Sequence, residues 1–484
     1  MERTIALAVE KPAPLEGRQL WAFLAVELAS VVLGVIFYRH ILWIVVGVVG
    51  VGLFFLLPAM PYVLLPLAFL ASALDLSGIL IQTELFNITY FHLFGGGLIL
   101  FSLAHMLYKT ETTFPRLPIV FPLFFFIMSM GFSSLYSPVA LEGLVYTIRA
   151  ALLSILLLIM VILIRTPKMV GWAVFWLLAL GVAMAIIGVV QTATEQVYFL
   201  PAEFVNLVGA SIPRATGLYH NPNEYATLLM ACIILAAALL LGAQKGREWL
   251  RVVLGFTILI LMAGLVVSFS RSNWLATLAG VGLVAVLSRR MKLVLLVLAT
   301  AFFILGVIAM LSPNIAELVI SRFTSIFTLF KEFKSSARVS SSVRVYLVIA
   351  SWYMFLDHPL LGIGTRGFPI IFEQYKPTNF PVWVPVRENH TLQAAILAEQ
   401  GVVGFLIALW LFYVVVKSGV QAVRWAGEPY IKAVAVGLLG VFIGYQVNLL
   451  FTAGLMDNFL WMTTGILFAV REIVRPKEYV CDSS

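Results

Sequence analysis

The 484-residue chain is 62% hydrophobic and only 11% charged, and its formal net charge is +8. Soluble domains carry roughly 25% charged residues, so this composition excludes an ordinary soluble protein and indicates one that resides in a lipid bilayer. The cysteines, Cys232 and Cys481, offer neither a disulfide framework nor a thiolate metal site, and redox chemistry is not expected.

Apolar runs near the length of a membrane span recur along the whole chain. Backbone amides in hydrocarbon must be satisfied within their own segment, and the runs lack in-out alternation, so helices are favoured over a barrel. We predict an all-α, polytopic transmembrane bundle of about 12–14 helices with one large, partly helical periplasmic loop. The runs lie at about 20 to 38, 41 to 57, 61 to 75, 90 to 108, 118 to 134, 141 to 164, 170 to 191, 224 to 242, 252 to 268, 273 to 288, 292 to 312, 393 to 416, 433 to 450 and 455 to 470.

The distribution of lysine and arginine predicts the orientation. With a cytoplasmic N-terminus, most basic residues fall inside, and the short outer loops hold only Arg39, Arg214 and Arg271. The net charge is then explained by topology and by anionic lipid headgroups, so nucleic acid is not an expected partner. The resulting division is a cytoplasmic tail (1–19), N-terminal transmembrane helices (20–191), a transmembrane core with outer arginine motifs (192–312), a large periplasmic loop (313–392), C-terminal transmembrane helices (393–470) and a second cytoplasmic tail (471–484).

Arginines gather at the outer ends of helices and in the long loop, as Arg214, Arg271, Arg344 and Arg366. A single arginine at such a place can simply extend to lipid phosphate. The positive-inside bias works against arginine in short outer loops, however, so Arg214 and Arg271 indicate an anionic partner. Arginine is also the residue that binds phosphate through two parallel hydrogen bonds.

His390 follows Arg387, Glu388 and Asn389 where the long loop re-enters the membrane. An interfacial histidine hydrogen-bonded to water is one interpretation. The other is a general base, because neighbouring guanidinium groups would lower the pKa of the imidazole and keep it neutral. No two acidic residues stand two positions apart, so a divalent metal site is not expected, and arginines would have to neutralise a diphosphate leaving group.

These motifs, in this order, resemble the O-antigen ligase and polymerase family, strongly over residues 200 to 405. The matching features are an R-x-x-G sequence followed by an NPN turn, an S-R-S sequence at a helix start, an HPLLGIG sequence preceded by an arginine, and a histidine that opens a helix carrying E-x-G-x-x-G. In this chain they are Arg214 to Asn223, Ser270 to Ser272, Arg344 with His358 to Gly364, and His390 with Glu399, Gly401 and Gly404. The family's usual order is His then Asn, whereas here Asn389 precedes His390.

The resemblance implies a metal-independent, inverting glycosyltransferase without a cofactor, in the bacterial inner membrane with its active site in the periplasm. The donor would be a glycan on undecaprenyl diphosphate, and the acceptor a glycolipid or glycan hydroxyl, such as that of the lipid A core. His390 would be the catalytic base. Arg214, Arg271, Arg344 and Arg366 would bind the diphosphate, with Asn223, Arg387, Asn389 and Asp457 in support.

Other functions remain open from the sequence. Within the same family, the acceptor could be a growing O-antigen or exopolysaccharide, or a protein hydroxyl. A transporter for a small anion such as bicarbonate could also place arginines in an outer vestibule. It would need a continuous polar path to the cytoplasm, and the scarcity of intramembrane charge argues against one.

Overall fold

The computed structural model describes residues 60–74, 79–82, 87–108, 117–196, 207–208, 212–243, 246–327, 339–378, 380 and 389–476. The chain divides at Pro61, and Tyr62–Ser484 form one compact unit that holds every contact discussed below. The apolar segments predicted at 20 to 38 and 41 to 57 lie outside the described residues, as does Arg387.

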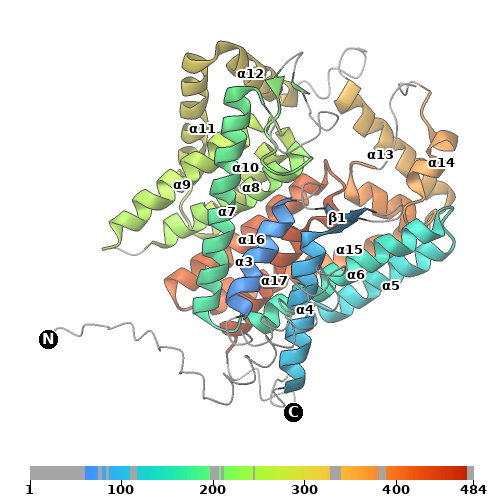
Figure 1. The fold of residues 1–484 in the computed structure, drawn as a ribbon. Helices are drawn as coiled ribbons and strands as arrows, with labels where there is room; N and C mark the ends of the chain where they lie inside the picture. The colour runs from blue at the N-terminus through green and yellow to red at the C-terminus, as the bar shows by residue number, and fades with distance from the viewer. Residues whose placement is uncertain are drawn as a thin grey trace, which may run out of the picture. The chain divides into compact units, whose positions relative to one another are not determined.

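The fold is all-α, as predicted, apart from two short antiparallel hairpins (Figure 1). Every apolar segment predicted from 61 to 75 onward coincides with a helix. The elements are α3 (Met60–Leu74), β1 (Ile79–Gln82), β2 (Asn87–Thr89), α4 (Tyr90–Tyr108), α5 (Val120–Leu135), α6 (Ala140–Leu163), α7 (Pro167–Thr194), β3 (Leu207–Val208), β4 (Ile212–Pro213), α8 (Pro222–Gly242), α9 (Glu248–Val267), α10 (Arg271–Leu287), α11 (Lys292–Leu311), α12 (Pro313–Phe327), α13 (Val339–Asp357), α14 (Phe368–Tyr375), α15 (Leu392–Trp425), α16 (Pro429–Leu449), η5 (Gly454–Met456) and α17 (Asn458–Ile473).

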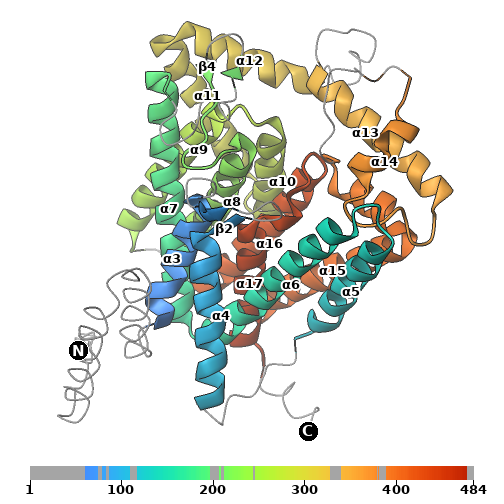
Figure 2. The ribbon, with the colours of Figure 1, turned by 45° about the vertical axis from the view of Figure 1, so that its right-hand side comes forward.

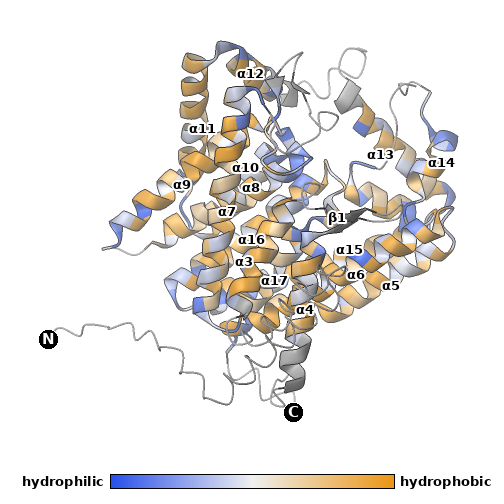
Figure 3. Cartoon of the chain, in the orientation of Figure 1, coloured by the Kyte–Doolittle hydropathy of each residue, from blue (hydrophilic) through white to orange (hydrophobic). Residues whose placement is uncertain are grey.

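Seven described helices are long and apolar enough to cross a membrane, and α3, α4, α5 and α10 contain shorter apolar stretches. The long ones are α6, α7, α8, α9, α11, α15 and α16. Hydrophobic residues dominate these helices, whereas hydrophilic residues gather at helix ends and in the connections (Figure 3). This distribution is what a bilayer requires, because a polar connection is stable only where water or protein can satisfy it.

Helix α8 lies at the centre of one group of helices and contacts α7, α9, α10 and α16. Small residues let these helices approach closely. A Cβ on Gly280 of α10 would collide with Ile234 of α8 and lie 2.8 Å from the carbonyl oxygen of Gly440 in α16. In a bilayer, where apolar burial gives little drive between helices, such close backbone packing holds a bundle together.

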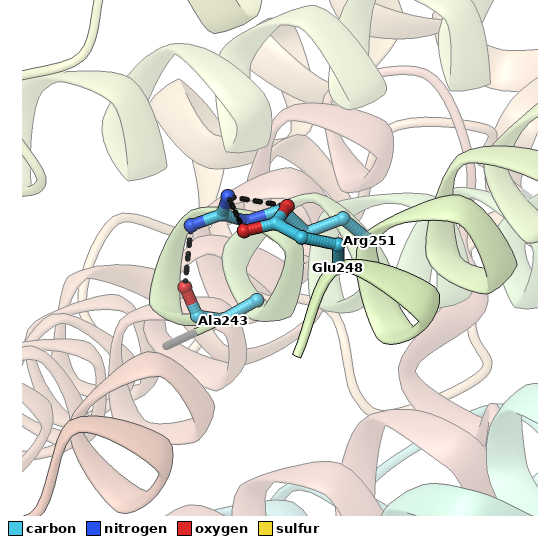
Figure 4. A network of polar contacts seen from close by, with 3 residues as sticks. All are labelled: Ala243, Glu248 and Arg251. Carbon is cyan, nitrogen blue, oxygen red and sulfur yellow. Dashed lines mark hydrogen bonds and ion pairs between the residues drawn. The ribbon is translucent and has the colours of Figure 1, made fainter. Parts of the chain in front are cut away.

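A second group consists of α5, α6, α15 and α17, and α16 contacts helices of both groups. Polar contacts complete the turns between neighbouring helices. Arg251, in the first turn of α9, pairs with Glu248 at 2.7 Å and donates a hydrogen bond of 3.0 Å to the carbonyl oxygen of Ala243, just after α8 (Figure 4). This pair therefore ties the start of α9 to the end of α8.

The long loop is largely helical and has its own apolar core. Helix α13 includes the predicted helical stretch from Val343 to Leu356, and its buried Leu347 and Met354 pack with Phe368 and Phe372 of α14 and Ala398 of α15. In Figure 2, α12 and α13 follow one another along the same edge, and β4 is drawn beside α12. The loop therefore rests on the helix that follows His390.

Candidate functional site

The turn that carries Arg214 is folded between β4 and α8. The Arg214 guanidinium donates one hydrogen bond of 2.9 Å from Nε to the carbonyl oxygen of Ser268 and one of 3.2 Å to Asn223 Oδ1. Asn223 Oδ1 also accepts a hydrogen bond of 2.9 Å from Ser270 Oγ. Asn223, predicted as a supporting residue, thus links Arg214 to the start of α10.

Helices α8 and α10 begin side by side at this turn. Asn221 caps α8 by accepting a hydrogen bond of 2.9 Å from the Asn223 N–H, and Asn273 in the first turn of α10 donates one of 3.0 Å to the Asn223 carbonyl. Arg271 is the first residue of α10. The N-terminus of a helix carries partial positive charge, so two adjacent N-termini reinforce the attraction of the arginines for an anion.

Three other guanidinium groups lie within electrostatic reach of Arg214 at this turn. The pKa of Arg214 is lowered to about 9, first by burial and then by the positive charges of Arg322, Arg344 and Arg271 in that order. The charges that act on Arg214 all come from other arginines. Because like charges raise the energy of the empty site, a bound anion would relieve the repulsion.

His390 lies at the point where the long loop meets α15. Its neighbour Asn389 is buried, donates a hydrogen bond to Ser351 Oγ of α13, and accepts one of 2.9 Å from the Thr391 N–H. Thr391 Oγ1 donates a hydrogen bond of 3.2 Å to the carbonyl oxygen of Leu450, directly after α16. The residues on either side of the histidine are therefore anchored to two helices, while the side chain of His390 itself is exposed.

The environment of His390 favours the neutral imidazole. Its side chain is accessible, yet surrounding protein atoms lower its pKa below 6.5, and the positive charge of Arg344 lowers that pKa further. The sequence predicted that a guanidinium group would have this effect, and the structure identifies Arg344 of α13 as that group. Arg344 also acts on Arg214, so it connects the histidine to the other arginines.

The HPLLGIG segment forms a backbone interlock with a kink in α15. Gly401 has a φ of 65° and interrupts the helix. There the Gly364 N–H donates a hydrogen bond of 3.0 Å to the carbonyl oxygen of Glu399, and the Val402 N–H donates one of 2.9 Å to that of Pro359. The kink leaves backbone groups of α15 without partners inside the helix, and the loop supplies hydrogen bonds to them, as buried backbone groups require. This motif serves as scaffold and holds α13 against α15.

Arg366 lies in a separate, small pocket. Its guanidinium carbon is 5.5 Å from the centre of the Tyr146 ring, a cation-π geometry, and its backbone φ is 64°. The pocket is also lined by Glu399 and Asn389. The structure therefore places Arg366 near the residue before His390 and over an aromatic ring, rather than among the charges that act on Arg214.

Asp457 caps α17. Its carboxylate accepts a hydrogen bond of 2.8 Å from the Phe459 N–H and one of 3.5 Å from the Tyr445 hydroxyl. Among the described residues, none of its hydrogen bonds involves an arginine. The contacts therefore explain Asp457 as a helix cap, a role in which aspartate is strongly preferred.

An apolar cavity of about 450 Å³ opens beside the start of α15. Residues of α5, α6, α15, α16 and α17 line it, among them Leu392, Gln393, Phe442 and Trp461. Gln393 Oε1 is buried there without a hydrogen-bond partner among the described residues. A cavity of this size and character can take a segment of a lipid chain close to His390.

Residues 255–409 match the family model described as O-Antigen ligase. The chain carries an O-antigen ligase domain. The apolar helices and this domain together support a multi-pass membrane protein with a glycosyltransferase-like activity. A search of curated proteins gave no match. The O-antigen ligase domain extends from α9 into α15, so it contains Arg271, Arg344 and His390, whereas Arg214 and Asp457 lie on helices and turns that flank it.

The O-antigen ligase domain also contains Arg322, which the sequence reasoning missed. Arg322 lies on the amphipathic helix α12, and its charge has the largest effect of the three arginines on Arg214. The positive-inside count is restricted to short loops, so it gives no weight to an arginine in the long loop. The available signal was its position within an amphipathic segment.

The histidine, cysteine, aspartate and glutamate side chains of the described residues form no group of three or more that could hold a metal ion.

Proposed function

We propose that this protein is a periplasmic glycosyltransferase that transfers a glycan from undecaprenyl diphosphate to an acceptor hydroxyl of the lipid A core or a related surface glycolipid. The proposal rests on one observation: Arg271, Arg322 and Arg344 all act as positive charges on Arg214, and Arg344 also favours the neutral form of His390. This combination supports a site for a diphosphate with a base beside it.

The reaction would proceed by direct displacement. His390 takes the proton of the acceptor hydroxyl, and the oxygen forms a bond to the anomeric carbon of the donor sugar. The bond from that carbon to the phosphate oxygen breaks, and its electron pair remains on the lipid diphosphate. Attack from the face opposite the leaving group inverts the anomeric configuration, so the product linkage would have the configuration opposite to that of the donor.

The arginines would act mainly on the transition state. Negative charge grows on the leaving phosphate as the bond breaks, so fixed guanidinium groups stabilise the transition state more than the bound donor. Arg214 is held by Ser268 and Asn223, which means that little reorganisation is needed during the reaction. In this proposal the arginines neutralise the negative charge that a metal ion neutralises in other enzymes. The lipid of the donor lies in the apolar cavity beside α15.

The test is a reconstituted assay with a lipid-linked glycan donor, no added metal and a chelator present. We expect His390→Ala to lower turnover by about 10²–10⁴-fold, the usual contribution of a general base. Arg271→Lys keeps the charge but loses the planar fork, so we expect a partial loss. His92→Ala, which changes an exposed histidine of α4, is the matched control and should keep full activity. Unimpaired turnover in folded His390→Ala would remove the histidine from the mechanism.

A further inference from the structure

Gln191, near the end of α7, holds the turn that follows Arg214. Its side chain is fully buried. The amide oxygen Oε1 accepts hydrogen bonds of 3.0 Å from the Thr216 N–H and 2.9 Å from the Gly217 N–H, and Nε2 donates one of 2.6 Å to the Gly217 carbonyl oxygen. One side chain therefore satisfies three backbone groups of the R-x-x-G turn.

The turn has little freedom to move while these bonds are present. Gly217 has a φ of 59°, and a Cβ there would lie 3.0 Å from the Tyr225 ring and 3.2 Å from Met184 Sδ. From the other side, the Ala215 N–H donates a hydrogen bond of 3.2 Å to the carbonyl oxygen of Val267, at the end of α9. The backbone next to Arg214 is therefore fixed by α7 and α9 together.

We propose that Gln191 is a positioning residue for Arg214. The inference rests on the proposed function, in which the Arg214 guanidinium binds the diphosphate. Ser268 and Asn223 hold the guanidinium end of Arg214, whereas Gln191 holds the backbone from which the side chain projects. Without the amide, the buried Thr216 and Gly217 N–H groups lose their partner, and the turn must shift to find another.

A shift of this kind affects rate more than binding. A misplacement of about 1 Å of a positioning group can cost about 10²-fold in rate, because the transition state tolerates less error than the bound substrate. Gln191 lies outside the O-antigen ligase domain, and its chain position is within a predicted apolar segment, where hydropathy alone assigns it no role.

The experiment compares variants at Gln191 with a variant of its neighbour. Gln191→Met has a similar size but makes none of the hydrogen bonds, and we expect kcat to fall about tenfold or more with little change in KM. Gln191→Glu keeps an acceptor for both N–H groups but, when ionised, sets a second acceptor against the Gly217 carbonyl oxygen, so it should lower kcat as well. Thr192→Val is the matched control, because Thr192 is also buried but, among the described residues, its hydroxyl donates only to the Gly188 carbonyl of its own helix, so kcat should stay unchanged.

A double-mutant cycle with Arg214→Lys separates positioning from general stability. If Gln191 acts through Arg214, Gln191→Met should reduce kcat much less in the Arg214→Lys background than in the native one, while the losses in melting temperature add. If Gln191→Met lowers kcat by the same factor in both backgrounds, or lowers the melting temperature without changing kcat, the inference about Gln191 is wrong. The proposed function would be unaffected by either result. Full turnover of Arg214→Lys would overturn the proposed function as well.

Discussion

Arg344 is the side chain of the site that acts on both Arg214 and His390. Its own pKa is lowered by burial. A buried cation that repels other cations is costly unless an anion joins it. Arg344 can therefore serve in two ways, as part of the diphosphate site and as the group that keeps the imidazole neutral.

The second role predicts a shift in the pH dependence. The general base must be neutral, so kcat/KM should fall only when the pH drops below the lowered pKa of His390. Arg344→Gln removes one of the two causes of that lowering, while the effect of the surrounding protein atoms remains. The pKa of His390 should then rise toward 6.5, and the acidic limb of the profile should move to higher pH. The measurement is kcat/KM between about pH 5 and 8.

Arg366→Gln is the control for this shift. The charge that lowers the pKa of His390 is that of Arg344, so removal of Arg366 should leave the position of the acidic limb unchanged even if turnover falls. An acidic limb that stays in place in Arg344→Gln, or moves to lower pH, would contradict the assignment of His390 as the base.

At the scale of the helices, the kink in α15 determines where His390 can lie. The interlock joins the loop after α13 to the residues around Gly401, and Ser133 Oγ of α5 donates a further hydrogen bond of 2.8 Å to the Glu399 carbonyl. Asn389 then joins the start of α15 to α13 through Ser351. Helices α5, α13 and α15 are thereby coupled, and the orientation of the first turn of α15 depends on all of them.

Gly401→Ala should therefore destabilise the protein. A φ of 65° places the residue in the left-handed region, which costs an ordinary residue roughly 1–2 kcal/mol, and the new Cβ would also collide with the Leu360 carbonyl group. We expect Gly401→Ala to have a lower melting temperature than the native protein when unfolding in detergent is measured by fluorescence. Gly255→Ala in α9 is the control, since a Cβ there meets nothing within 4 Å. Equal melting temperatures for the two variants would show that the interlock does not stabilise the fold.

The proposed function of the whole molecule depends on the side of the membrane on which the site lies. The distribution of basic residues predicts that α12, α13, α14 and His390 lie in the periplasm and that both termini lie in the cytoplasm. Helices α8 and α10 begin side by side, and Arg344 acts both on Arg214 and on His390 just before α15. These three N-termini, and the arginines beside them, therefore face the same side of the membrane. The site is therefore either wholly periplasmic or wholly cytoplasmic.

The native cysteines allow a direct test. Cys232 is buried, so a membrane-impermeant maleimide should react only with Cys481, and only after the membrane of intact spheroplasts has been opened. In a Cys481→Ser background, Gln374→Cys on the exposed surface of α14 should react in intact spheroplasts. Cys481→Ser alone is the control and should remain unlabelled. The opposite pattern would place the site in the cytoplasm and exclude a periplasmic transferase.

The sequence by itself determined the features that depend on local composition. Apolar runs of the length of a bilayer predicted α3 to α11 and α15 to α17, because the need to satisfy backbone amides in hydrocarbon acts within each segment. The same reasoning singled out Arg214, Arg271 and His390, because a charged or titratable residue beside an apolar run is conspicuous in the chain itself. Residue types and spacing were enough for these predictions.

Only the tertiary structure decided which of these side chains act together. It added Arg322 to the arginines around Arg214 and placed Arg366 over Tyr146. It also showed that HPLLGIG supports a kink. Each of these results depends on contacts between residues far apart in the chain, such as Gly364 with Glu399. Hydropathy and spacing report only what a segment prefers on its own, whereas such contacts arise from the packing of helices against one another.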